Sequence, residues 1–274
     1  MPGFSAAVVQ MRSGIDVPAN IAAMEELVRE AASQGATYIQ TPEMTGLVQK
    51  NRKPFIESVK TEVEDPVAPA ASALAKELGI TLHTGSTPVL VEESRAANRA
   101  YVFGPDGACR ATYDKIHMFD VALGGGETYS ESTNYAPGDR AVLTEAAGGR
   151  LGLTICYDVR FAALYRRLAK AGAQMISVPS AFTRPTGRAH WETLLRARAI
   201  ETGSFILAPA QGGKHEDGRK TWGRSMVIGP WGEIVAAFDH DEPGVLHAEI
   251  DLDEVEAARS RIPSLSNDRE FTGP

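Results

Sequence analysis

The chain has 274 residues, of which 43% are hydrophobic, and its 28 basic and 35 acidic residues give a net charge of −7 at pH 7. A chain of this length and composition can bury a large core, which excludes general disorder. The acidic balance argues against nucleic acid as a partner, because a surface that follows phosphates is basic.

The sequence gives no sign of a membrane segment, an export signal or a metal centre. No apolar run approaches the ~18 residues of a spanning helix, and the start, MPGFSAAVVQMR, has no basic residue before its short apolar stretch. Two cysteines, Cys109 and Cys156, are too few for a disulfide framework and match no zinc-site spacing. We therefore expect a cytoplasmic protein that needs no metal or other cofactor and has no membrane partner.

Short β-rich runs alternate with helical patterns in the first half of the chain, which is typical of an α/β fold. A strand is predicted over 4–10, followed by a helix over 21–34 with Asn20 as its N-cap and apolar residues along one face. The further elements predicted in this half are a strand over 38–40, a helix over 70–78, a strand over 81–84 and a hairpin over 99–114.

The second half follows the same plan. Its predicted elements are a strand over 151–155, a helix over 160–171, a strand over 175–178, a helix over 191–202, a strand over 205–208 and a hairpin over 224–239. The correspondence suggests an internal repeat, in which each half contributes one sheet and one pair of helices.

Two pairs of segments support the repeat. QGATYIQTPE aligns with AGAQMISVPS, and RAYVFGPDGACRATYD aligns with RSMVIGPWGEIVAAFD around a shared Gly-Pro-x-Gly turn. Chance similarity of common hairpins is the alternative. If the repeat is real, neither half covers its sheet alone, so we predict a single domain over 1–274 with an α-β-β-α sandwich. Residues 252–274 are expected to form a C-terminal arm or interface element.

The stretch LGLTICYDVRF contains the first candidate catalytic residue. Apolar residues run up to Cys156, and Asp158 can cap the helix that follows, so the cysteine falls at a strand-to-helix turn. A nucleophile at such a turn is exposed near backbone N–H groups that can stabilise an oxyanion. The alternative is a small buried hydrophobic residue.

Two further charged residues stand at the ends of predicted strands. TPEMTG places Glu43 just past a strand, and YDKIHMFD places Lys115 just after the first hairpin. A buried glutamate without a task is costly, although each residue alone could also be solvated. Other constellations are weaker: no His, Asp or Glu cluster has metal-ligand spacing, and Gly124–Gly126 lacks the strand–glycine–helix context of a phosphate loop.

Together the three motifs resemble the Glu, Lys and Cys motifs of the nitrilase superfamily, the carbon-nitrogen hydrolases. They occur in the family order, and the resemblance extends to SAFTRPTGRAHWETLLRARAIE and GRSMVIGPWG, covering nearly the whole chain. It implies the duplicated α-β-β-α sandwich. It also implies that Cys156 is the nucleophile, Glu43 the general base and Lys115 the cation that stabilises the oxyanion.

The family often has a second glutamate between the lysine and cysteine motifs. Glu131 in GGGETYSESTNYAPGD is the best match, with Glu127 as the competing candidate. The backbone N–H of Tyr157 is a second expected donor to the oxyanion.

The segments HWETLLRARAIE and AQGGKHEDGRKTWGRSMVIGPWG look closest to the Nit branch, whose amidases act on deaminated glutathione or, as ω-amidases, on α-ketoglutaramate-like amides. The resemblance implies hydrolysis of a small carboxylate-bearing amide, not a nitrile, to acid and ammonia through a cysteine thioester. The nearer resemblance is to the amidases of deaminated glutathione. Arg160, Thr183 and Arg184, with Arg188 as a further arginine, are candidates to bind the substrate carboxylate. A homodimer or higher homo-oligomer is also implied.

Two other readings stay open. A papain-like enzyme would pair Cys156 with His117 or His190 as base, but neither histidine lies in a sequence context resembling that family. A binding module that retains the fold without turnover is the non-enzymatic reading. Ammonia release from small amides separates it from an amidase.

Overall fold

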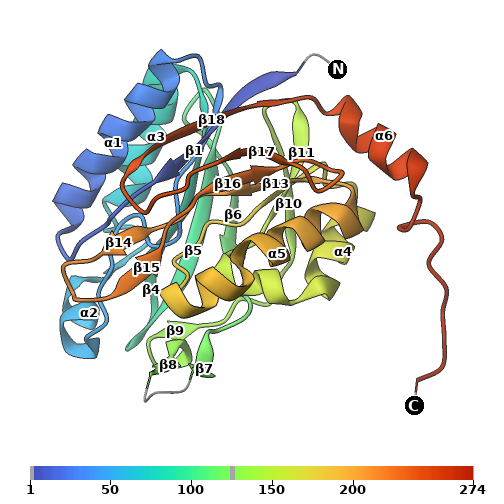
Figure 1. Ribbon diagram of the computed structural model, residues 1–274. Helices are drawn as coiled ribbons and strands as arrows, with labels where there is room; N and C mark the ends of the chain where they lie inside the picture. The colour runs from blue at the N-terminus through green and yellow to red at the C-terminus, as the bar shows by residue number, and fades with distance from the viewer. Residues whose placement is uncertain (1–2, 124–126, 274) are drawn as a thin grey trace.

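The computed structural model describes residues 3–123 and 127–273, so the glycine loop Gly124–Gly126 lies outside the described residues. The described residues form four layers (Figure 1). Helices α1 (Val17–Ser33) and α3 (Val67–Leu78) cover one side of two stacked sheets, and α4 (Ala162–Lys170) and α5 (Arg184–Thr202) cover the other. The predicted α-β-β-α sandwich is confirmed.

The two large sheets have the same strand order and the same pattern of directions. The first runs β18-β1-β2-β4-β5-β6 and the second β10-β11-β12-β13-β16-β17. In each, three parallel strands are central, one antiparallel strand lies on one side and two lie on the other. This topology supports the internal repeat, but the prediction that each half contributes one whole sheet was wrong, because the edge strand over 244–250 in the first sheet comes from the second half of the chain. The strands of the first sheet are β18 (Gly244–Ile250), β1 (Phe4–Gln10), β2 (Tyr38–Gln40), β4 (Thr81–Glu92), β5 (Arg95–Phe103) and β6 (Cys109–Asp114). Those of the second are β10 (Val142–Ala146), β11 (Gly149–Leu153), β12 (Met175–Ser177), β13 (Phe205–Ala208), β16 (Met226–Ile228) and β17 (Ile234–Ala237).

Smaller elements surround one end of the sandwich. They are α2 (Arg52–Ser58), β3 (Lys60–Thr61), β9 (Tyr135–Ala136), the ribbon of β7 (Asp120–Ala122) and β8 (Thr128–Ser130), the ribbon of β14 (Gly212–Lys214) and β15 (Lys220–Trp222), and two 3-10 helices, Glu131–Thr133 and Cys156–Arg160. The C-terminal helix is α6 (Asp253–Arg261). None of the helices in the described part of the chain has an apolar stretch long enough to span a bilayer.

Strand β1 shows why these apolar runs form strands with both faces buried. Ala6 and Val8 point into the core between the two sheets, whereas Ala7 and Val9 point into the core beneath α1 and α3. Successive residues of a strand face opposite sides, so a strand covered on both faces needs a continuous apolar run and not an alternating one.

Two predicted helix starts were wrong. Helix α1 begins at Val17, and the side chain of Asp16 caps it by accepting from the Ala19 N–H at 2.9 Å. Asn20 is instead buried and donates to the carbonyl oxygens of Gly14 and Gly46. A proline in the first turn marks this start and that of α5, which begins at 184 and not 191.

The C-terminal segment divides into two parts. Leu252, Val255 and Ala258 are buried, so α6 packs on the sandwich and is not an arm. Beyond it, the chain runs along the outside of the molecule, with Phe271 90% exposed (Figure 1). Of the predicted arm or interface element over 252–274, the arm describes only the residues after α6, and the interface element stays a prediction.

Candidate active site

The three motif residues follow strands of both sheets. Glu43 lies just past β2, Lys115 directly after β6 and Cys156 just past β11. Cys156 opens the 3-10 helix Cys156–Arg160 with a φ of 51°, a left-handed conformation that is strained for any residue other than glycine. Its N–H donates to the Pro179 carbonyl at 2.9 Å. The predicted turn is confirmed, but Asp158 lies within this 3-10 helix and does not cap α4, whose N-cap is Phe161.

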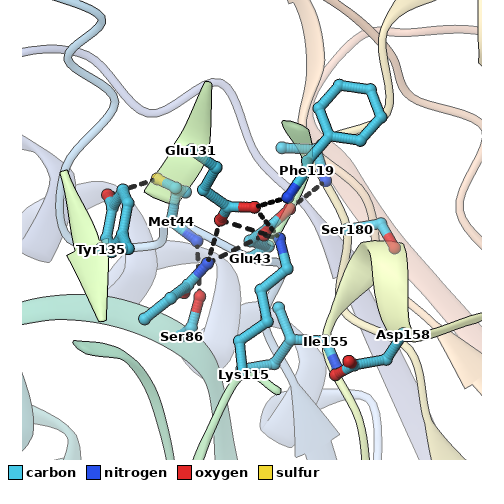
Figure 2. A network of polar contacts seen from close by, with 12 residues as sticks. Glu43, Met44, Ser86, Lys115, Phe119, Glu131, Tyr135, Ile155, Asp158 and Ser180 are labelled. Atoms are coloured by element: carbon cyan, nitrogen blue, oxygen red, sulfur yellow. Dashed lines mark hydrogen bonds and ion pairs between the residues drawn. The ribbon is translucent and has the colours of Figure 1, made fainter. Parts of the chain in front are cut away.

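Glu43 is the centre of the site (Figure 2). Its Oε1 accepts from the Lys115 Nζ at 2.8 Å, and its Oε2 accepts from the Ala181 N–H at 2.8 Å. Glu43 also acts on Cys156, because its negative charge raises the pKa of that thiol. The side chains of Glu43 and Lys115 are only 3% and 2% exposed, so their attraction is little screened by water. The structure thus brings together three residues distant in sequence.

Of the two candidate second glutamates, Glu131 contacts the lysine. Both of its carboxylate oxygens lie 2.9 Å from the Lys115 Nζ, and its Oε2 also accepts from the Phe119 N–H at 2.6 Å. Glu127 instead accepts from the Tyr129 hydroxyl at 2.5 Å. Lys115 is therefore held between two carboxylates, as Figure 2 shows.

Asn98 belongs to the same cluster and was missed by the sequence reasoning. It is buried on β5, and its Nδ2 donates to Glu43 at 2.9 Å and to Glu131 at 3.3 Å. The available signal was a polar residue inside the β-rich run RAANRAYVF. An asparagine here supplies a donor to both carboxylates without adding charge.

Burial and neighbouring charge set the protonation of the cluster. Burial raises the pKa of the Cys156 thiol well above its usual range, and the charge of Glu43 raises it further while Lys115 opposes both. Burial alone lowers the pKa of Lys115, but Glu131 and Glu43 outweigh it, so the pKa is well above its ordinary value. Burial also raises the pKa of Glu131, partly offset by Lys115. The resting site holds a neutral thiol beside an ammonium.

A cavity of about 730 Å³ opens onto these groups. Glu43, Lys115, Glu131 and Cys156 line it, and so does Tyr157, whose N–H has no hydrogen-bond acceptor among the described residues. The site can therefore present a thiol, a base and oxyanion donors to one bound group.

The predicted substrate-binding residues are only partly in place. Thr183 and Arg184 line the cavity, but Arg160 does not. The guanidinium of Arg160 lies over the rings of Tyr157 and Phe182 and 3.3 Å from the His190 ring. Arg184 lines the rim but is paired with an aspartate, Asp241, at 2.6 Å. The further candidate, Arg188, is exposed and outside the cavity lining.

Three basic residues that the sequence analysis did not name also line the cavity: Lys50, Arg219 and Lys220. Arg219 and Lys220 come from the β14–β15 hairpin, in the charged segment KHEDGRK. That charged run was the available signal, although only the tertiary structure turns it toward the site.

The histidine alternative finds no geometric support. Neither His117 nor His190 lines the cavity; His117 bonds Asp158 at 2.7 Å, and His190 lies 3.3 Å from the Arg160 guanidinium. No group of three or more His, Cys, Asp or Glu side chains suited to a metal ion occurs within 3–123 and 127–273.

The chain is similar to known proteins along nearly its whole length. Residues 5–260 match the family model described as carbon-nitrogen hydrolase. The chain is 36% identical to the deaminated glutathione amidase of Yersinia enterocolitica, over 98% of this chain and 94% of the relative. It is 34% identical to the omega-amidase of Homo sapiens, over 96% and 94%.

Solved structures agree. The NitFhit protein of C. elegans superposes with a TM-score of 0.91 at 35% identity, covering 97% of this chain and 65% of that one. A mutant amidase from Nesterenkonia sp. AN1 superposes with a TM-score of 0.81 at 25% identity, covering 97% and 94%; it carries the acetamide moiety of fluoroacetamide added covalently at its active-site cysteine.

Proposed function

Because this chain belongs to the carbon-nitrogen hydrolase family and hydrolyses amide C–N bonds, we propose that Cys156, Glu43 and Lys115 carry out that hydrolysis on a small amide bearing a carboxylate. The observation that carries the proposal is the buried ion pair of Glu43 with the Lys115 ammonium, in a cavity that Cys156 also lines. A neutral thiol beside a carboxylate is the arrangement that general-base activation requires.

In the first half-reaction, the Cys156 sulfur attacks the amide carbonyl carbon while Glu43 accepts the thiol proton. Negative charge develops on the carbonyl oxygen, where the Lys115 ammonium and the Tyr157 N–H stabilise it. A donor of this kind contributes about 3–4 kcal/mol. Glu43 then gives its proton to the leaving nitrogen, so ammonia departs and a thioester remains.

In the second half-reaction, Glu43 takes a proton from water as the water oxygen attacks the thioester carbon. The tetrahedral intermediate collapses, the C–S bond breaks, and the sulfur recovers the proton from Glu43. Amide and water have become acid and ammonia. Glu131 keeps Lys115 charged and in place, since both of its oxygens accept from the ammonium.

The basic residues of the cavity favour a substrate with a carboxylate away from the scissile bond. Arg219 is the best placed of them: its side chain is 22% exposed, and its ion pair with Asp217 is 3.7 Å long, beyond hydrogen-bonding distance. Arg184 is less available because it already pairs with Asp241. Arg219 can therefore form a bidentate pair with the substrate, and Thr183 also lines the cavity.

Deaminated glutathione fits this description, and two relatives at 36–38% identity are named for that activity. An ω-amide such as α-ketoglutaramate is the second candidate, since the human omega-amidase is 34% identical. A simple nitrile is not expected.

The test is ammonia release from deaminated glutathione, α-ketoglutaramate and an uncharged amide such as propionamide. We expect Arg219→Met to raise KM for the best acidic amide by roughly 10-fold or more, the value of one charged hydrogen bond, and to leave propionamide unaffected. Arg188→Met, which removes an exposed arginine outside the cavity, is the matched control. Equal effects of Arg219→Met on both kinds of amide reject the carboxylate contact. Absence of ammonia from every amide favours the binding module.

We also propose that residues 1–274 act as one domain in the cytoplasm and assemble as a homo-oligomer. Ile200, Trp231 and Ile262 are 56%, 51% and 58% exposed around a second cavity of about 430 Å³. Exposed apolar groups of this size commonly mark an association surface. Light scattering of the wild type and of Trp231→Glu tests it, and a monomeric wild type contradicts it.

A further inference from the structure

Asp158, two residues after Cys156, is completely buried and accepts hydrogen bonds from two segments of the site. Its Oδ2 accepts from the Ile155 N–H at 2.9 Å and from the Tyr113 hydroxyl at 2.7 Å. Its Oδ1 accepts from the His117 N–H at 3.0 Å and lies 2.7 Å from the ring Nδ1 of the same residue. A carboxylate oxygen only accepts, so that ring nitrogen carries the hydrogen.

The positions of these donors are informative. Ile155 directly precedes Cys156, and Tyr113 and His117 stand two residues before and two residues after Lys115. One carboxylate therefore binds the segment that carries the nucleophile and both sides of the segment that carries the ammonium. Figure 2 shows Asp158 beside Ile155, below the end of Lys115.

The backbone hydrogen bonds of the two segments do not join them to each other. The Lys115 N–H donates to the Asn98 carbonyl on the first sheet, while the Cys156 N–H donates to the Pro179 carbonyl after a strand of the second. The bonds to Asp158 therefore cross from one repeat to the other. The Ile155 bond also holds the turn in which Cys156 adopts its positive φ.

We propose that Asp158 is a positioning residue that fixes the Cys156 sulfur relative to the Lys115 ammonium by clamping their two segments together. The inference rests on the roles proposed above for these two residues. It assigns Asp158 no contact with substrate, so its removal should slow the chemistry without weakening substrate binding. His117 completes the clamp by stacking on Phe161, with ring centroids 3.5 Å apart.

Asp158→Asn is the central test. An amide matches the carboxylate in size but turns an NH₂ toward one pair of donors, which pushes the segments apart. We expect kcat to fall about 100-fold, the usual cost of a displacement near 1 Å, with KM within about threefold of wild type. Asp65→Asn is the matched control, because Asp65 is also buried and accepts from a backbone N–H, that of Ala68, at the start of α3.

A gentler variant covers the case in which Asp158→Asn does not fold. Tyr113→Phe removes one hydroxyl from the clamp, and we expect about a tenfold lower kcat with KM unchanged. Tyr101→Phe on β5 removes the hydroxyl of another buried tyrosine, which donates to Glu62 outside the clamp, and is the control. If both residues act through the clamp, the double variant Asp158→Asn/Tyr113→Phe loses little more than Asp158→Asn alone.

The rate of alkylation of Cys156 by iodoacetamide gives a readout that needs no turnover. We expect about a tenfold slower reaction in Asp158→Asn and little change in Asp65→Asn. A wild type that alkylates rapidly yet hydrolyses no amide defeats the proposed function but leaves the clamp testable. The clamp is overturned if Asp158→Asn and Tyr113→Phe both keep the wild-type kcat and the wild-type alkylation rate. It is also overturned if Asp65→Asn and Tyr101→Phe lose as much of either rate as the clamp variants do.

Discussion

Replacing Lys115 with methionine tests the charge balance of the site most directly. The ammonium is 2% exposed and lies 2.8–2.9 Å from oxygens of Glu43 and Glu131. Methionine fills similar space but leaves two buried carboxylates with no cation between them.

Removing one partner of a buried ion pair typically costs about 3–5 kcal/mol, because an uncompensated charge remains in a medium of low polarity. We expect the free energy of unfolding to fall by about this amount at pH 8. We also expect kcat to fall about 10²- to 10³-fold, because the oxyanion loses a donor.

The stability lost in Lys115→Met depends on pH in a direction that can be predicted. Burial already raises the pKa of Glu131, and Lys115 opposes that rise. Without the lysine the folded-state pKa rises further above its unfolded value, so the folded variant binds more protons than the unfolded chain as the pH falls. The stability deficit of Lys115→Met must therefore shrink from pH 8 to pH 5.

The measurement is urea unfolding followed by tryptophan fluorescence at both pH values, with Lys53→Met as a control for an exposed lysine. A variant as stable as wild type at pH 8, or a deficit that grows on acidification, refutes the reasoning. It would mean that the two carboxylates are not held against Lys115 in the folded protein.

Two further predictions concern residues beside the site. Burial lowers the pKa of His83 to about 3, so the folded state keeps it neutral while the unfolded chain protonates near pH 6.5. The contribution of neutral His83 to stability is complete above that pH and is lost as the pH falls toward 3. Between pH 6 and 4 we expect the free energy of unfolding, measured with urea, to fall by roughly 2–3 kcal/mol more in wild type than in His83→Gln. Parallel pH curves for the two proteins contradict this. A Cβ at Gly85 would overlap the carbonyl oxygens of Thr41 and Pro42, just before Glu43. Gly85→Ala should therefore lose about 1–3 kcal/mol of stability and should also lower kcat. A thermal midpoint and a kcat equal to those of wild type show that the turn does not need this close approach.

The repeat and the residues of the three family motifs could be read from the sequence because each depends on a local pattern. Continuous apolar runs mark strands buried on both faces, and Glu43 and Cys156 each follow such a run, whereas Lys115 follows the second strand of the predicted hairpin. The helix starts were misjudged for an equally local reason: the proline in the first turn and the true caps, Asp16 and Thr183, were overlooked.

What surrounds those residues was decided by the tertiary structure. Asn98 reaches the two carboxylates only because β5 lies beside the Lys115 segment, and Arg219 lines the cavity only because the β14–β15 hairpin packs against it. Arg160 follows the nucleophile closely in sequence yet stacks on aromatic rings and does not line the cavity. Local patterns fix which residues form an element and which face is buried. The direction of a side chain at a strand end depends on contacts between elements that the chain order does not specify.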